Sequence, residues 1–362
     1  MASVRFEVYF DEKFIDAIDD QIDTQDENLA DFLAFCKKFQ GGEVDIYTDM
    51  SVDKISSKRN ESFFFRSINA NGGPIFQSLP ELNMLLALES FYSSTTGYKL
   101  FFVEREDIDV LKDDFGYLYF NIQKIVTDWK DFSRARIQEI GTFPITTNTD
   151  CEPRLDNWSY LRHFQHPLNS ILICDRYILQ DKHTFRHNLF QIFEQLICKN
   201  IRELQFEIFI ISELKGTAKV GDKWQNIDND IVEYGRIIQE KLQRRFGVDR
   251  IQITLIKLVS DRENRDLFYK EHGRSFITNY WYLNPHNSFN FFKYDAVKKS
   301  VVLSVQDNMD IRFTFHKEVR NILKARLMNF QDITQSINDI PTQKRLYGFP
   351  EIIKKSRLLP MR

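Results

Sequence analysis

Cysteine, glycine and proline are scarce in this sequence. Its 362 residues include 4 Cys, 13 Gly and 9 Pro. The four cysteines, at positions 36, 151, 174 and 198, form no C-x-x-C pair, so neither a zinc ribbon nor a dense disulfide framework is expected. The shortage of glycine and proline favours long regular elements over a turn-rich all-β protein.

Strong net charge and long apolar runs are also absent. The 49 Lys and Arg against 52 Asp and Glu leave a net charge of -3 at pH 7, so binding to nucleic acid would require a local basic face. No apolar window approaches the roughly 18 residues of a membrane span, and residues 1–14 lack the basic and apolar regions of a secretory signal. We therefore expect a cytoplasmic protein without integral membrane association.

Motifs of the common nucleotide and hydrolase sites are missing as well. The sequence contains no G-x-x-x-x-G-K-[ST], no G-x-G-x-x-G and no G-x-S-x-G. A P-loop ATPase is therefore excluded, and neither a dinucleotide fingerprint nor a nucleophile elbow is present. No cofactor and no metal ion are predicted.

Phenylalanine, by contrast, is abundant, and its 33 residues indicate a large apolar core. In the second part of the chain, buried-strand patterns at 170–174, 206–211 and 251–256 alternate with helical patterns at 185–196 and 231–246. This alternation predicts βαβ units. The expected fold class is α/β with two domains, the C-terminal one a mainly parallel sheet with flanking helices.

The pattern of strands and helices lapses in residues 141–170, where Pro, Thr, Asn and Asp gather as in a loop. We place a domain boundary there, near residue 150. The expected organisation is an acidic α/β domain at 1–150, a second α/β domain at 151–330 and a basic C-terminal tail at 331–362.

The most informative stretch is EHGRSFITNY, residues 271–280, which follows the third strand of the second domain. His272 and Arg274 are two positions apart, so both lie on one face of a strand. A guanidinium at Arg274 can fork onto phosphate oxygens, while His272 can donate a proton or attack phosphorus. The polar Asn279 follows five residues after Arg274.

This stretch resembles the signature H-x-K-x4-D of the phospholipase D superfamily, written here as His272-x-Arg274-x4-Asn279, with Arg for Lys and Asn for Asp. With Tyr280-Trp281 after it, the motif is also similar to the phospholipase D-like C-terminal domain of ESCRT-associated MIT proteins, which keeps the fold for binding rather than hydrolysis. The resemblance covers about residues 165–330. It implies a phospholipase D-like fold with His272 as the nucleophile, Arg274 as the phosphate clamp and Asn279 as an orienting group. Because the superfamily needs two histidines, it also implies a homodimer for catalysis.

Further candidate binding residues lie outside this motif. Asp175 and Arg176 follow a buried strand, at the edge where α/β sheets present ligands, and Asp175 either orients His272 or caps a βα turn. Basic residues of the tail would track a phosphate backbone or dock a partner protein. These residues are Lys344, Arg345, Lys354 and Lys355.

Two other groups allow both a functional and a structural interpretation. His183 and His187, four residues apart, form either a metal-binding pair or a solvated helix start. The acidic residues between positions 11 and 20 form either a Mg²⁺ nuclease cluster or a solubilising helix face.

Two functional hypotheses follow. In the first, the protein binds a phosphodiester, with nucleic acid as the ligand, as part of a prokaryotic defence or processing complex. If catalysis occurs, the protein is a metal-independent phosphodiesterase. In the second, the protein is a non-catalytic scaffold that uses the same fold to dock protein partners or lipid headgroups.

Overall fold

The structure is a computed structural model of the chain. It describes residues 4–21, 26–39, 44–69, 73–93, 96–133, 141–180, 182–197, 202–220, 223–247, 251–258, 274–338, 346–348 and 356–359. The fold is mixed α/β, with two main sheets and two separate hairpins.

In the N-terminal part (residues 4–133), five short strands form a sheet whose neighbouring strands all run parallel. They are β1 (Glu7–Phe10), β2 (Asp45–Thr48), β3 (Phe76–Ser78), β4 (Lys99–Phe102) and β5 (Leu118–Phe120). Their order is β3-β2-β1-β4-β5. Continuous apolar runs such as residues 100–103 form these strands because both faces of the sheet are covered.

Helices cover both faces of this sheet. They are α1 (Glu12–Asp19), α2 (Glu27–Lys37), α3 (Val52–Glu61), α4 (Phe63–Asn69), α5 (Leu82–Leu85), α6 (Glu89–Ser93), α7 (Ile108–Phe115) and α8 (Ile122–Ser133). Phe101 and Phe102 are adjacent on β4, so their rings point to opposite faces. The Phe101 ring contacts Tyr92 of α6, whereas the Phe102 ring contacts Phe32 of α2.

The C-terminal part (residues 141–359) contains an eight-stranded sheet with the order β17-β11-β8-β7-β12-β13-β16-β6. Its strands are β6 (Gly141–Ile145), β7 (Ser170–Cys174), β8 (Phe206–Ser212), β11 (Ile251–Lys257), β12 (Ser275–Thr278), β13 (Trp281–Pro285), β16 (Asp307–Phe313) and β17 (Leu346–Tyr347). The neighbours β7, β8 and β11 are parallel, and the other pairs are antiparallel. The expectation of a mainly parallel sheet is therefore wrong. The three strands that alternate with helices are parallel as predicted, but β12, β13 and β16 then pair antiparallel in succession.

Helices cover both faces of this sheet too. They are the 3₁₀ helix η3 (Trp158–Phe164), α9 (Lys182–His187), α10 (Leu189–Leu196), α11 (Ile231–Phe246) and α13 (Lys317–Asn338). The ring of Phe193 in α10 contacts Phe276 of β12, while Arg326 of α13 donates to the neighbouring Ser275 at 2.7 Å. Adjacent strand residues face opposite ways, so α10 and α13 lie on opposite faces. Among the helices that the structure describes, none is long and apolar enough to cross a bilayer.

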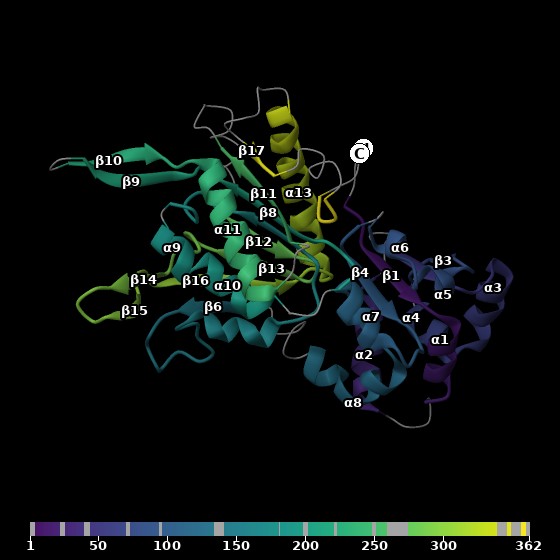
Figure 1. Ribbon diagram of the computed structural model, residues 1–362. Helices are drawn as coiled ribbons and strands as arrows, with labels where there is room; N and C mark the ends of the chain where they lie inside the picture. Colours follow the sequence, from purple (N-terminus) through teal and green to yellow (C-terminus); the bar gives the residue numbers. More distant parts are fainter. Residues whose placement is uncertain are drawn as a thin grey trace.

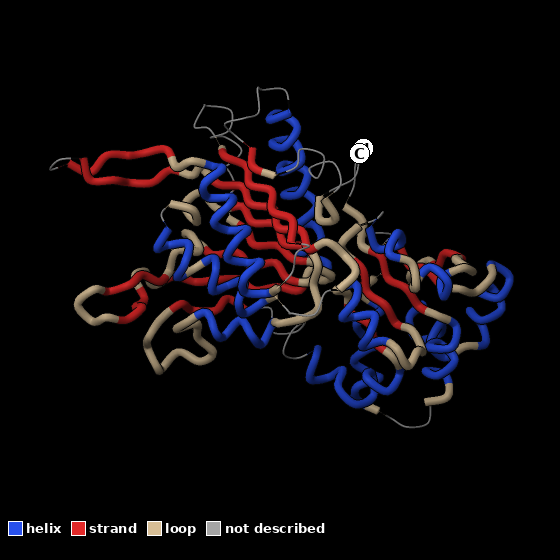
Figure 2. Tube along the Cα trace, viewed as in Figure 1, coloured by secondary structure: helices blue, strands red, loops and turns tan. Residues whose placement is uncertain are grey.

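Two hairpins extend from the body of the C-terminal part, as Figure 1 shows. One consists of β9 (Lys215–Val220) and β10 (Lys223–Asp228), and the other of β14 (Phe292–Asp295) and β15 (Ser300–Leu303). Each is a two-stranded antiparallel sheet that is not paired with the main sheet in the described residues. Figure 2 shows both as pairs of strands outside the main sheet.

The boundaries between the parts differ from those expected. Strand β6 pairs with β16 in the C-terminal sheet, so the boundary lies before Gly141 rather than near residue 150. The expected tail at 331–362 is also not a separate segment throughout. Residues 331–338 belong to α13, β17 pairs with β11, and residues 356–359 are buried.

Candidate functional site

The predicted motif and the predicted acid meet at one edge of the C-terminal sheet. Strands β7, β8 and β11 are parallel, so their carboxyl ends lie at the same edge. Strand β12 starts at this edge, because Ser275 pairs with Cys174 in the antiparallel register. Arg274 therefore lies beside Asp175. Burial raises the pKa of the Asp175 carboxyl, and the positive charge of Arg274 opposes that rise without cancelling it. We call this region the β7 edge.

Asp175 organises the loop that covers the β7 edge. Its fully buried carboxylate accepts hydrogen bonds from the Tyr177 N–H at 2.7 Å, the Ser288 hydroxyl at 3.0 Å and the Phe289 N–H at 2.9 Å. Burial raises the pKa of this carboxyl, and the hydrogen bonds lower it. Three donors use most of the acceptor capacity of one carboxylate, so this geometry is that of a turn cap.

Two arginines lie at the β7 edge in different environments. Arg176 forms an ion pair with Glu213, with Nε 2.8 Å from Oε2. Arg274 is half-buried and donates from Nη1 to the His286 carbonyl at 3.1 Å. Both guanidinium groups lie near the Tyr177 ring, Arg176 at 5.0 Å and Arg274 at 5.8 Å from its centroid. Within the described residues, the His286 carbonyl is the one hydrogen-bond acceptor of Arg274, which leaves other guanidinium N–H groups for a ligand.

Side-chain amides hold the backbone of this edge in place. Asn229 donates to the carbonyls of Leu179 at 3.1 Å and Gln180 at 2.9 Å, and Asn290 donates to the Tyr177 carbonyl at 2.6 Å. Leu214, directly after the Arg176 partner Glu213, has φ of 52°, a strained value for a residue with a branched side chain. The edge is therefore pre-organised, which lowers the entropy lost when a ligand binds.

Five other predicted site residues lie outside the described residues. They are His272, Lys344, Arg345, Lys354 and Lys355. Their assigned roles stay predictions. Arg357, which follows the last two lysines, is described and is buried, with its Nε 3.1 Å from the Ser170 hydroxyl and 3.6 Å from a Glu207 carboxylate oxygen.

The structure does not bring Asn279 to the β7 edge. Asn279 lies at the other end of β12 from Arg274, five residues and therefore roughly 16 Å along an extended strand. It is fully buried, and its side-chain oxygen accepts from the N–H groups of Asn169 at 2.9 Å and Ser170 at 3.1 Å. Its amide nitrogen donates to the Gly97 carbonyl at 2.6 Å. Asn279 thus joins the N-terminal and C-terminal parts instead of orienting a phosphate.

Four of the five acidic residues between positions 11 and 20 also have structural partners. Asp11 caps α1 by accepting from the Phe14 N–H at 2.7 Å, and Asp19 accepts from the Phe64 N–H at 2.9 Å. Glu12 and Asp16 form ion pairs with Lys54 and Lys58. In the part of the chain that the structure describes, no group of three or more His, Cys, Asp or Glu is arranged to hold a metal ion.

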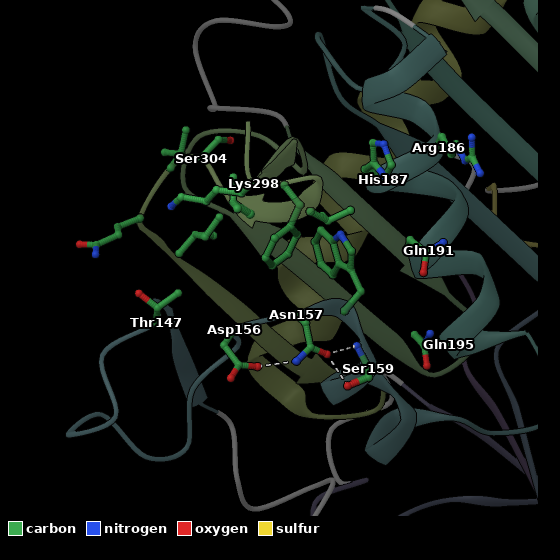
Figure 3. Close-up of a pocket in the computed structure, with 17 residues that line it drawn as sticks. Thr147, Asp156, Asn157, Ser159, Arg186, His187, Gln191, Gln195, Lys298 and Ser304 are labelled. Atoms are coloured by element: carbon green, nitrogen blue, oxygen red, sulfur yellow. Dashed lines mark hydrogen bonds between the residues drawn. The ribbon is translucent and has the colours of Figure 1, made fainter. Parts of the chain in front are cut away.

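A second candidate site, missed by the sequence analysis, lies between the β14–β15 hairpin and the helices (Figure 3). It is a groove of about 790 Å³, which we call the β15 groove. Charged and polar side chains line it together with the Trp158 and Phe292 rings. The polar lining includes Asn157, Arg186, His187, Gln191, Gln195 and Lys298.

His187 lines the groove, and its ring stacks on Tyr294 with centroids 6.1 Å apart. The side chain of His183 lies outside the described residues. Lys298 and Lys299 add positive charge to this hairpin, but the sequence did not predict a groove here. Nothing local indicates that this hairpin faces α9 and α10, because the groove joins segments more than 100 residues apart in sequence.

Comparisons with protein-family models, with curated proteins and with solved structures each returned no match to this chain. The geometry of the two sites and the motif at 272–279 are therefore the basis on which a function is proposed.

Proposed function

We propose that this protein recognises a phosphodiester, with nucleic acid as the ligand, at the β7 edge. The observation that supports this most is the position of Arg274. Its half-buried guanidinium lies at the carboxyl edge of three parallel strands, next to an aromatic ring, with one protein acceptor among the described residues. Parallel strands present ligands at this edge.

A phosphate group suits this arrangement chemically. A guanidinium fork binds two phosphate oxygens at once through charge-assisted hydrogen bonds. Arg176 and the last residue of β11, Lys257, add two cations to the same edge, against the carboxylates of Asp175 and Glu213. Arg274, whose described acceptor is a carbonyl and not a carboxylate, is the cation of this edge that favours an anionic ligand.

The resemblance to the phospholipase D superfamily adds His272 to this proposal. The motif assigns His272 the role of nucleophile on the phosphorus bound by Arg274. Cleavage, which would need a second His272 from a homodimer, is separate from binding.

Binding is tested by the fluorescence anisotropy of a labelled single-stranded oligonucleotide of about 20 nucleotides, titrated at about 50 and 200 mM salt. Arg274→Ala should weaken binding about tenfold and reduce the salt dependence by about one phosphate contact. The affinity of Arg274→Lys should lie between those of the wild type and Arg274→Ala, because an ammonium group keeps the charge but cannot bind two phosphate oxygens as a guanidinium does.

Arg59→Ala is the matched control, because Arg59 is exposed on α3 and its loss changes the net charge equally. The proposal is wrong if the wild-type protein does not bind at about 50 mM salt, or if the Arg274 and Arg59 variants bind equally well. Loss of cleavage without loss of binding in His272→Ala would assign that residue to catalysis.

A further inference from the structure

The two strands of the β14–β15 hairpin differ in how their outer edges are used. Ser304 donates its N–H to the Phe291 carbonyl at 2.7 Å, so these two residues form a hydrogen-bonded pair. The next pair along the hairpin is Phe292 with Leu303. In an antiparallel pair, hydrogen-bonded and non-hydrogen-bonded positions alternate. Phe292 on β14, and Val301 and Leu303 on β15, therefore direct their backbone N–H and C=O groups outward, away from the hairpin.

On β14, a side chain closes this outer edge. The Asn188 oxygen accepts from the Phe292 N–H at 2.9 Å, and the Asn188 nitrogen donates to the Phe292 carbonyl at 2.8 Å. Asn188 thus bonds to β14 as a neighbouring strand would. On β15, no described residue does the same for the outward groups of Val301 and Leu303. Unpaired edges of this kind readily accept another strand.

The open edge of β15 borders the β15 groove. Six consecutive residues, 301–306, line the groove. If only one face of the strand bordered the groove, every second residue would line it, so the main chain of this segment must face the groove. Val301 is 49% exposed and Val305 is 44% exposed, although edge strands usually carry charge or proline as protection. Across the groove, Gln191 of α10 offers an amide group to a bound main chain, whereas the side-chain oxygen of Gln195 already accepts from Arg162 at 2.7 Å.

The charges around the groove favour an acidic occupant. Arg186 and Lys298 line it without an ion pair to any described residue. Asp156, the carboxylate in the lining, lies 3.6 Å from Arg154, a cation that it shares with Glu152, so the lining carries two cations against one partly compensated carboxylate. Lys293 and Lys299 are exposed on the same hairpin, so two copies of β15 would bring like charges together. A second copy of this chain is accordingly a poor occupant.

We propose that an extended, acidic segment of a partner protein adds as a strand to the outer edge of β15. Its main chain pairs with Val301 and Leu303, alternate apolar side chains contact the exposed valines, and its carboxylates face Arg186 and Lys298. This is β-augmentation, in which main-chain bonds supply affinity and side chains supply selectivity. It requires no phosphodiester and is independent of Arg274.

The experiment uses the full chain and a labelled peptide of about nine residues in which Glu and Val alternate. We expect saturable binding, with slower amide hydrogen exchange at Val301 and Leu303. The same peptide with N-methyl groups on all residues should lose binding, because it has no N–H left to donate to the strand edge. A peptide with Lys in place of Glu should bind at least tenfold more weakly.

Variants of the protein separate the contribution of main-chain pairing from that of charge. Val301→Pro removes an outward N–H without removing a bond within the hairpin and should abolish binding, with unchanged exchange at Val302 as the test of folding. Arg186→Glu and Lys298→Glu should each weaken binding about tenfold at low salt, and Lys293→Glu, outside the groove lining, by no more than about twofold.

Three results would overturn the proposal. The first is a lack of binding by the Glu–Val peptide. The second is equal binding by the N-methylated peptide, and the third is equal effects of the Lys298 and Lys293 substitutions. Oligonucleotide binding that is weakened by Arg186→Glu, together with no binding by the Glu–Val peptide, would assign the groove to nucleic acid instead.

Discussion

Glu7 and Lys99 form an ion pair inside the N-terminal sheet, with the Lys99 Nζ 2.9 Å from the Glu7 Oε2. The two residues are paired on the neighbouring strands β1 and β4, and neither side chain is more than 5% exposed. The Tyr9 hydroxyl donates to the same carboxylate oxygen at 2.7 Å, and the Phe91 ring centroid lies 4.4 Å from Nζ. Burial lowers the pKa of Lys99, while the charge of Glu7 raises it.

Removing one member of this pair should be strongly destabilising. Lys99→Met leaves the Glu7 carboxylate buried without a counter-charge, and we expect a loss of about 3–5 kcal/mol in the free energy of unfolding. The double variant Glu7→Gln with Lys99→Met should recover a large part of that loss. Urea denaturation of the four proteins in this cycle measures the coupling. A cost below about 1 kcal/mol for Lys99→Met would contradict the buried geometry.

Asn279 should affect stability and leave the β7 edge intact. Asn279→Ala leaves the N–H groups of Asn169 and Ser170 and the carbonyl of Gly97 without a partner in a buried position. We expect a loss of about 2–4 kcal/mol in the free energy of unfolding. Oligonucleotide binding by the folded variant should equal that of the wild type. Normal stability with lost binding would instead return Asn279 to the role that the motif implies.

Asp11 should make the N-terminal part more stable as the pH falls from neutral. Burial raises the pKa of Asp11 from 3.8 to about 6 in the folded protein. A raised folded-state pKa contributes stability that is complete below about pH 4 and is lost as the pH rises through about 6. The difference between wild type and Asp11→Asn should therefore change by up to about 3 kcal/mol between pH 4 and 7.5. Urea denaturation across that range measures it, and a pH-independent difference would contradict the shift.

Gly235 should be intolerant of alanine although it lies inside a helix. A Cβ at this position of α11 would lie 2.2 Å from the Tyr347 ring of β17. Alanine favours a helix over glycine by about 1 kcal/mol, but this overlap should cost about 1–3 kcal/mol and displace β17. In a Tyr347→Ala background, Gly235→Ala should become stabilising. If Gly235→Ala were still destabilising in that background, the Tyr347 ring would not be the cause of the destabilisation.

Much of the C-terminal sheet could be predicted from local pattern. The strands at 170–174, 206–211 and 251–256 are confirmed as β7, β8 and β11, and their parallel pairing follows from the intervening helices. Gly247 ends α11 with φ of 64°. It directly follows the helical pattern at 231–246, and glycine is the residue that most readily adopts this conformation at the end of a helix. The antiparallel return through β12, β13 and β16 was missed, because no local signal states which neighbour a strand will take.

The candidate sites, too, could be predicted from the sequence only in part. The sequence indicated Asp175 because it follows a buried strand and Arg274 because of its place in the motif, and the register of β7 with β12 places the two together. It also grouped Asn279 with them, since motif spacing counts residues and not distance. The β15 groove had no pattern of its own, because its walls come from a hairpin and from helices that are far apart along the chain.

By itself, the sequence determined which segments are strands and helices, and which carry an apolar face. Those properties depend on the spacing of neighbouring side chains. Only the tertiary structure decided what the buried amides do. Asn279 meets the Gly97 carbonyl 182 residues away, and Asn188 meets the Phe292 carbonyl 104 residues away. A polar group that leaves water must find a partner, and folding selects that partner from the whole chain.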